Sequence, residues 1–455
     1  AELSLRHGDE AWAVLAWDES PAGWSAEAAR EALAATARYW LGWQRRLSYA
    51  GPRSKRIEHS ALIIHLLGYA PTGALVAAPT TSLPERIGGE HNYDYRYTWV
   101  RDASLSVAGL SLLGDKETAT RYLDWLATLK SSSETPLQVA YHITGATDLH
   151  QRDRTDIDGY RGSLPVRIGN RAFNQIQLGS LGYLADCTLI HIEQGGEWKP
   201  AYWPMIRRIA DYTAAHWREP DSGIWELPAR EQYTSSKVMS WVVLDRAVKL
   251  AERTGNGDAD ELGRWRRERD AIHADVMHHG WSDRICSFVQ RYGAEALDAS
   301  LLLIPVMGFL PPDHPRVRQT MDRIEEQLTI DGLVYRFEPL ETPVEHRLPL
   351  GAFEGAFLPC TFWLATAQAM AGRADKADAA LRRAESLTQE VGLFAEEADA
   401  RSDELLGNYP LLFSQVEYVR AVLAFRDASA GNRPAQGVGH ERREQSREAE
   451  PAGAR

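Results

Sequence analysis

The sequence lacks several features that would place it in common classes of protein. It has only three cysteines, Cys187, Cys286 and Cys360, which lie far apart and form no CxxC pair, so neither a disulfide framework nor a zinc site is indicated. Its apolar runs are too short to cross a bilayer, and the densest covers only residues 301–306. We expect a soluble, cytoplasmic protein with buried free thiols. Secretion stays open, because the first residue is not Met and a leader or domain could precede it.

Positive charge is also in deficit. Lys and Arg number 51 against 63 Asp and Glu, and a net charge of −12 gives no electrostatic footprint for nucleic acid or an anionic membrane. Nucleotide-binding glycine loops, GxSxG and HExxH are missing, and His91 has no second ligand at metal-binding spacing. We therefore expect no nucleic-acid or membrane partner, no metal and no cofactor, while the oligomeric state stays open.

The sequence is rich in helix-forming segments of two kinds. Segments 317–328 and 374–387 carry apolar residues along one stripe, as helices on a surface do. Segments 237–251, 300–310 and 355–371 are apolar nearly all round and must be covered on most sides. The two kinds predict an outer and an inner layer, with about twelve helices from residue 59 onward. The fold class is therefore expected to be all-α, a closed double ring of helices.

The chain divides into four expected regions. Residues 3–19 partly alternate polar and apolar side chains and predict one or two strands in a region that covers 1–20. A linker helix region is expected over 21–58, with Ser25 as a helix N-cap. The helical barrel should cover 59–427, and the tail 428–455 is too poor in large apolar residues to fold.

Five stretches between the predicted helices are rich in aromatic, polar and glycine residues: 84–102, 158–170, 219–237, 331–355 and 392–415. Long loops in a compact domain are usually functional, so we expect these five to share one face. Aromatic rings stack on the C–H faces of sugars, and charged side chains bind their hydroxyls. A small carbohydrate is therefore the expected ligand.

Three clusters in these loops could carry chemistry. Trp99, Arg101 and Asp102 precede an apolar helix, where an Arg–Asp pair could grip adjacent hydroxyls or could merely cap the helix. Glu226 follows a tryptophan in a glycine-containing turn, where partial burial would raise a carboxyl pKa toward that of a general acid. Glu396 begins a pair of carboxylates after an apolar turn, although solvated glutamates would look the same.

Four runs together resemble glycoside hydrolase family 15, which contains glucoamylases, bacterial trehalases and related α-glucosidases. They are GGEHNYDYRYTWVRDASL, SGIWELPAREQYTSSKVMSWVVLDRA, EGAFLPCTFWLATAQAMAGR and GLFAEEADARSDELLGNYPLLFSQ, in that order along the chain. The resemblance implies an (α/α)6 barrel, inverting hydrolysis and a pocket for one terminal glucose. It also implies that residues 1–20 are the last strands of an N-terminal β-sandwich.

The resemblance assigns roles to individual residues. It implies that Glu226 is the general acid and Glu396 the general base, with carboxyl groups roughly 6.5–9.5 Å apart. For Glu354 two roles stay open, direct contact with the substrate or only the anchoring of an arginine. The expected substrate-binding residues are Trp99, Arg101, Asp102, Tyr160, Arg161, Trp225, Arg336, Glu354 and Glu397.

The chain departs from the family pattern after the expected acid. Leu227-Pro228-Ala229 supplies no charged side chain there, so we expect the side of the pocket that holds the leaving group to differ from the family pattern. We expect an inverting, exo-acting hydrolase that releases glucose from a small α-glucoside such as trehalose or a short malto- or isomalto-oligosaccharide. The alternatives are an inverting α-glucoside phosphorylase, in which phosphate replaces water, and a non-catalytic sugar-binding protein on the same scaffold.

Overall fold

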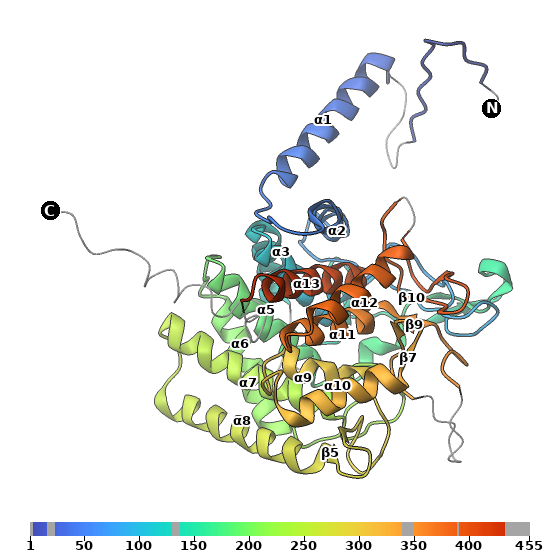
Figure 1. Ribbon diagram of the computed structural model, residues 1–455. Coiled ribbons are helices and arrows are strands. Elements are labelled where there is room, and N and C mark those ends of the chain that lie inside the picture. Colours follow the sequence, from blue (N-terminus) through green and yellow to red (C-terminus); the bar gives the residue numbers. More distant parts are fainter. Residues whose placement is uncertain (1–2, 16–22, 130–136, 339–348, 389–390, 433–455) are drawn as a thin grey trace. The chain divides into compact units, whose positions relative to one another are not determined.

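The computed structural model describes residues 3–15, 23–129, 137–338, 349–388 and 391–432 (Figure 1). The chain divides into two compact units, Ala1–Ser48 and Tyr49–Arg455. The second unit contains all but one of the described α-helices. The barrel thus begins before residue 59, and its first helix, α2 (Ser54–Leu66), crosses the boundary expected from the sequence.

The first unit consists of an extended segment and helix α1 (Ala26–Gln44). The Ser25 hydroxyl accepts a hydrogen bond from the Ala28 backbone N–H, as expected of an N-cap. Residues 3–15 contain a turn but no strand, so alternation alone misled the strand prediction there; the remainder of that prediction, residues 16–19, lies outside the described residues. A strand needs a neighbour to exchange backbone hydrogen bonds, which a polar/apolar pattern does not supply.

Six helical segments of the described chain form a closed inner ring. Each packs against the next, and the last returns to the first. Every residue of α11 is buried, which confirms that the all-round apolar segments lie inside. The members are α3 (Val100–Leu112), α5 (Ser180–Glu193), α7 (Thr234–Thr254), η3 with α9 (Ala299–Leu302, Leu303–Val306), α11 (Leu358–Met370) and α13 (Leu412–Ser429).

Six further described helices pack against the members of this ring from outside. α10 shows their character, because Val317, Met321 and Ile324 are buried on one stripe and its other side faces solvent. Six inner and six outer members among the described residues make an (α/α)6 barrel, as predicted. The outer members are α2 (Ser54–Leu66), α4 (Lys116–Thr128), α6 (Tyr202–His216), α8 (Ala259–His279), α10 (Pro315–Gln327) and α12 (Ala374–Ser386).

The inner segment expected at 300–310 is shorter than predicted. It starts as a 3₁₀ turn and ends at Val306. Pro305 has no N–H to continue the α-helical hydrogen bonds, and Gly308 adopts a φ of 76°, which a helix cannot contain. α13 runs two residues past the expected end at 427, and most of the predicted tail, 433–455, lies outside the described residues.

Short strands and 3₁₀ turns lie within the loops that connect the helices. β1 leads directly into α3, and β9 directly into α11, so both place side chains at the start of an inner helix. The antiparallel pairs are β1 (Thr98–Trp99) with β2 (Ala140–Tyr141), β3 (Arg152–Arg154) with β4 (Val166–Ile168), β5 (Trp281–Ser282) with β6 (Ser287–Phe288), and β7 (Thr329–Ile330) with β8 (Leu333–Val334). β10 (Glu397–Ala398) lies between β9 (Ala356–Phe357) and β11 (Leu405–Leu406). The 3₁₀ turns η1 (Tyr160–Gly162) and η2 (Arg171–Asn174) lie between β3 and α5.

Two further expectations concern the burial of the three cysteines and the lack of a segment long and apolar enough to cross a bilayer. Cys187 and Cys360 are buried, but Cys286 is exposed in the turn between β5 and β6, so one of the three thiols was placed wrongly. Within the described ranges, no helix has the length and apolar character needed to traverse a bilayer.

Candidate active site

A cavity of about 500 Å³ opens among the loops that join the two rings. All five aromatic loops contribute to its wall, which confirms that they share one face. Its volume falls in the range of small-molecule pockets, roughly 300–1,000 Å³. Representative lining residues are Glu85, Tyr95 and Trp99 from the first loop, Arg167 and Asn170 from the second, Trp225 and Glu226 from the third, Arg336 and Glu354 from the fourth, and Glu396 and Phe413 from the fifth.

Glu226 lies on one wall of this cavity. Its backbone has a φ of 60°, which residues other than glycine rarely adopt and which marks a locally strained turn. Trp99 Nε1 donates a hydrogen bond of 2.8 Å to Glu226 Oε1, and Arg101 Nη1 lies 3.5 Å from the same oxygen. Burial raises the pKa of the Glu226 carboxyl, although the Arg101 charge offsets part of that effect. A raised pKa favours the protonated form of this carboxyl, which is the form that a general acid requires.

Glu396 lies in the same cavity and is almost completely buried. Tyr95 donates its hydroxyl hydrogen to Glu396 Oε1 at 2.6 Å, and the Asn408 backbone N–H donates to Oε2 at 3.0 Å. Burial and the nearby Glu85 charge raise the pKa of Glu396 to about 8, while the Tyr95 hydrogen bond opposes that rise. Two donors thus fix the direction in which this carboxyl faces the cavity.

One aromatic pair connects the two carboxyl groups. The rings of Tyr95 and Trp99 meet edge to face, with centroids 5.4 Å apart. Tyr95 donates to Glu396 and Trp99 donates to Glu226, so the two partners of this pair each hold one carboxyl. The fold therefore brings the two expected catalytic residues to one site, and their expected separation and roles stay predictions.

Arg101 and Asp102 sit at the start of α3, and both line the cavity. Arg101 Nε donates to Asp102 Oδ1 at 2.9 Å, and Arg101 Nη1 donates to the Ile224 carbonyl at 3.0 Å. The guanidinium also lies over the Phe413 ring, 5.6 Å from its centroid. This pair therefore fixes the loop that carries Glu226, in addition to any contact with a ligand.

Arg336 is the centre of a second charged cluster. Its Nη2 donates to Glu85 Oε2 at 2.9 Å, its Nε donates to Glu354 Oε1 at 3.0 Å, and Nη2 lies 3.6 Å from Glu397 Oε1. Burial raises the pKa of Glu397, and the neighbouring Glu85 charge adds to this rise. Glu354 therefore has the arginine-anchoring contact that the sequence left open. Glu397 also accepts a hydrogen bond from the Gly355 N–H, which ties β10 to the start of β9.

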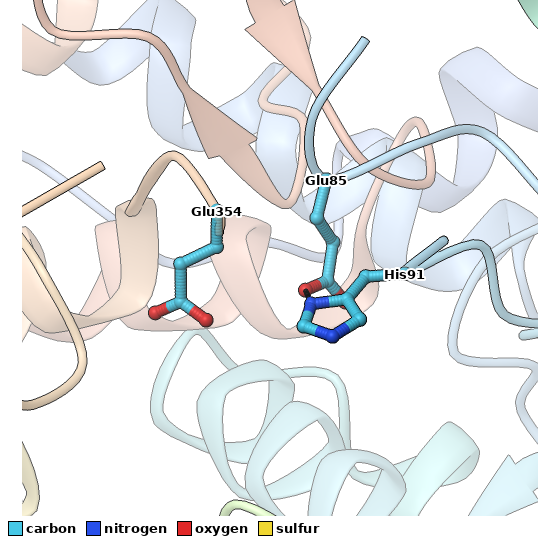
Figure 2. Close-up of side chains that lie close together, drawn as sticks. All are labelled: Glu85, His91 and Glu354. Atoms are coloured by element: carbon cyan, nitrogen blue, oxygen red, sulfur yellow. Dashed lines mark ion pairs between the residues drawn. The ribbon is translucent and has the colours of Figure 1, made fainter. Parts of the chain in front are cut away.

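Figure 2 shows Glu85, His91 and Glu354 close together in this cluster. Their potential ligand atoms lie within 4.8 Å of one another, a spacing that a metal ion could span. However, the Arg336 guanidinium already contacts both carboxylates, and its positive charge would repel a cation there. A hydrogen bond to Glu85 raises the pKa of His91 and thereby favours the protonated ring, which cannot act as a ligand. The arrangement fits an ion-pair network better than a metal site.

Three other expected substrate-binding residues have different surroundings. Trp225 lines the cavity, but its Nε1–H is directed to Asp298 Oδ2 at 2.9 Å and is therefore committed to the protein. Tyr160 and Arg161 lie in η1, are exposed, and are not part of the cavity wall. Arg161 forms an ion pair with Glu404 instead. The cavity gives no support to a substrate role for these two residues.

The sequence did not single out several residues that shape the site. Glu85, Tyr95 and Arg171 line the cavity, and Gln175 Nε2 donates to the Glu226 carbonyl at 2.9 Å. Tyr95 stands in the same motif as Trp99, four residues earlier, and this was the one available signal. The others carry no local pattern, because their partners are distant in sequence.

Comparison with known proteins agrees with this geometry. The chain is 39% identical over 428 residues to the trehalase of Mycobacterium tuberculosis (strain ATCC 25618 / H37Rv), covering 93% of this chain and 62% of that protein. It is 36% identical over 395 residues to the trehalase of Thermoplasma acidophilum, covering 86% and 66%. The chain thus spans about two thirds or less of the length of these relatives.

The fold is also shared with a solved structure. A bacterial glucoamylase complexed with acarbose superposes with a TM-score of 0.67 at 16% identity, over 89% of this chain and 62% of that one. The sequence profile described as Glycosyl hydrolases family 15 matches residues 51–423, which include every inner and outer helix of the barrel except the end of α13. With the barrel, the cavity and the two carboxyl groups in place, the match is conclusive: the chain belongs to glycoside hydrolase family 15.

Proposed function

We propose that this protein hydrolyses trehalose with inversion at the anomeric carbon. The observation that carries the proposal is the position of Glu226 and Glu396 on one cavity, each held by one ring of the Tyr95–Trp99 pair. The trehalase names of the relatives support the choice of substrate. The barrel, the cavity volume and the family membership support a glycoside hydrolase in general.

In the proposed reaction, Glu226 donates its proton to the glycosidic oxygen as the bond from that oxygen to the anomeric carbon breaks. Glu396 removes a proton from a water molecule, whose oxygen attacks the anomeric carbon from the opposite face. The attacked glucose is released as the β-anomer, and the leaving glucose, whose own C1–O bond is not broken, is released as the α-anomer. The proton gained by Glu396 replaces the one lost by Glu226, so a proton exchange with solvent restores the starting state.

Two features favour hydrolysis over the alternatives. A phosphorylase must bind phosphate at the position of the attacking water, beside Glu396, but the arginine whose charge acts on Glu396, Arg336, already pairs with Glu85 and Glu354. A sugar-binding protein without activity has no need of two buried carboxyl groups that face one cavity. Retaining them costs stability through desolvation, and catalysis explains that cost.

The test follows trehalose cleavage by rapid proton NMR with purified protein. We expect α- and β-glucose to appear in equal amounts in the first spectra, one from each half of trehalose, and the β share then to rise through mutarotation. Initial release of α-glucose alone would contradict inversion, because retention leaves both halves of trehalose in the α configuration. A higher kcat/KM for maltose, isomaltose or soluble starch than for trehalose would replace the proposed substrate.

A further inference from the structure

Among the described residues that line the cavity, four are arginines, and they differ in how they are bound. Arg101 pairs with Asp102, and Arg336 pairs with Glu85 and Glu354. Arg167 donates to two backbone carbonyls, lies 3.4 Å from Asp153 Oδ1 and stacks over the Tyr93 ring at 5.1 Å. Of these four cavity arginines, only Arg171 has a guanidinium without an ion pair, hydrogen bond or ring partner among the described residues, and its side chain is exposed.

The backbone that carries Arg171 is firmly held. Arg171 is the first residue of η2, and the Asn170 side chain caps this turn by accepting from the Ala172 N–H at 2.9 Å. Asn170 Nδ2 also donates to the Asp94 carbonyl at 3.3 Å, and Ala172 packs in the apolar cluster that contains Trp99. Arg171 therefore projects from a fixed platform, as a recognition residue should.

This platform lies beside the loop of the proposed acid. Gln175 follows η2 immediately, and its Nε2 donates to the Glu226 carbonyl at 2.9 Å. The general acid protonates the oxygen of the leaving sugar, so the leaving sugar lies next to the acid loop. The residues that continue this loop into the cavity wall, Leu227 and Pro228, offer no side-chain hydrogen bond.

We propose that Arg171 is the residue that binds the leaving sugar, donating hydrogen bonds from its guanidinium to two neighbouring hydroxyls. The inference rests on the proposed function and adds to it the source of selectivity for a sugar leaving group. Arg171 supplies the polar partner that Leu227 and Pro228 do not. Its planar fork of N–H donors matches the spacing of adjacent ring hydroxyls.

The experiment compares two substrates that share the glucose but differ in what leaves. Trehalose places a sugar against Arg171, whereas α-glucosyl fluoride releases only a fluoride ion and leaves that region empty. For Arg171→Ala we expect kcat/KM for trehalose to fall about 10- to 100-fold, the usual effect of losing hydrogen bonds from a charged donor. Its kcat/KM for α-glucosyl fluoride should stay within about twofold of wild type.

Two further variants make the test specific. Arg171→Lys keeps one charged donor and should recover part of the trehalose activity. Arg318→Ala removes an exposed arginine from α10, outside the cavity wall, and should leave both substrates unaffected. Equal losses of Arg171→Ala on both substrates would assign it a structural role and overturn the inference, as would unchanged activity on trehalose.

Failure of the proposed function is visible in the wild-type protein. If it cleaves α-glucosyl fluoride and another disaccharide but not trehalose, the substrate proposal is wrong. The Arg171 inference is then tested by comparing the effect of Arg171→Ala on kcat/KM for that disaccharide with its effect on kcat/KM for α-glucosyl fluoride. If wild type cleaves α-glucosyl fluoride but no disaccharide, both proposals are overturned.

Discussion

Removal of one hydroxyl group should change the pH at which this protein works. Tyr95→Phe deletes the hydrogen bond of 2.6 Å to Glu396 Oε1 and keeps the ring that packs on Trp99. The deleted bond stabilises the ionised carboxylate, so its loss raises the pKa of Glu396 further above the value of about 8 that burial and Glu85 impose. Glu396 acts as a base only when it is deprotonated, so the active form appears at a higher pH in the variant.

The size of this effect follows from the strength of the bond. A hydrogen bond to a charged group contributes about 1.5–3 kcal/mol, and each pH unit corresponds to about 1.4 kcal/mol. The midpoint of the activity profile should therefore move upward by about one to two pH units. At pH 7 the Tyr95→Phe variant should be about 10- to 100-fold less active than wild type, and the two should converge at high pH.

Fluoride release from α-glucosyl fluoride is the appropriate assay. Fluoride leaves without a proton from Glu226, so the profile reports Glu396 alone and should rise through a midpoint near 8 in the wild-type protein. Tyr97→Phe makes the same chemical change two residues away, where the side chain does not line the cavity, and should leave the midpoint unchanged. A wild-type midpoint near 4.5, or a downward shift in Tyr95→Phe, would refute the reasoning.

The remaining predictions concern the two carboxyl groups and the Arg336 cluster. Glu226→Gln should lose most trehalose activity, by about 10²- to 10⁴-fold, but retain fluoride release, whereas Glu396→Gln should lose both; the reverse pattern would exchange their roles. Arg336→Ala should lower the free energy of unfolding by about 3–5 kcal/mol in urea titrations at neutral pH, because it strands buried carboxylates. Burial opposes ionisation of Glu85, but Arg336 and His91 hold its pKa below the ordinary value, so the loss should shrink as the pH falls through that pKa. A loss that grows on acidification would contradict this account.

Much of the barrel could be predicted because helix periodicity is a local property. The stripes at 317–328 and 374–387 gave α10 and α12 to within two residues, and the all-round apolar segments gave α7 and α11. The prediction failed at 300–310, where Pro305 interrupts the hydrogen bonds of an otherwise apolar segment. It also failed at 3–15, because strand formation depends on a partner and not on alternation alone.

The site could be predicted only where its residues belong to compact motifs. Glu226 and Glu396 were found because each stands in a distinctive run, and the fold then placed both on one cavity. The contacts that set the pKa values and positions of the site's carboxyl groups join residues far apart in the chain. Tyr95 and Glu396 are separated by 301 positions, and Arg336 and Glu85 by 251, so no local pattern reveals either contact. Arg171 was missed for a related reason, since its importance comes from lacking a partner.

Gly407 shows how closely the backbone is fitted around the base. A Cβ atom there would lie 2.5 Å from Glu396 Oε2 and 2.6 Å from its Cβ, and the residue has a φ of 71°. Gly372, with a φ of 76° and nothing within 4 Å of an added Cβ, is a matched control. Both changes to alanine should lower the free energy of unfolding by about 1–2 kcal/mol through backbone strain, but only Gly407→Ala should displace Glu396. We expect a loss of at least about tenfold in kcat for Gly407→Ala, since a small misplacement of a catalytic group is costly, whereas equal activity of the two variants would show that the base tolerates movement.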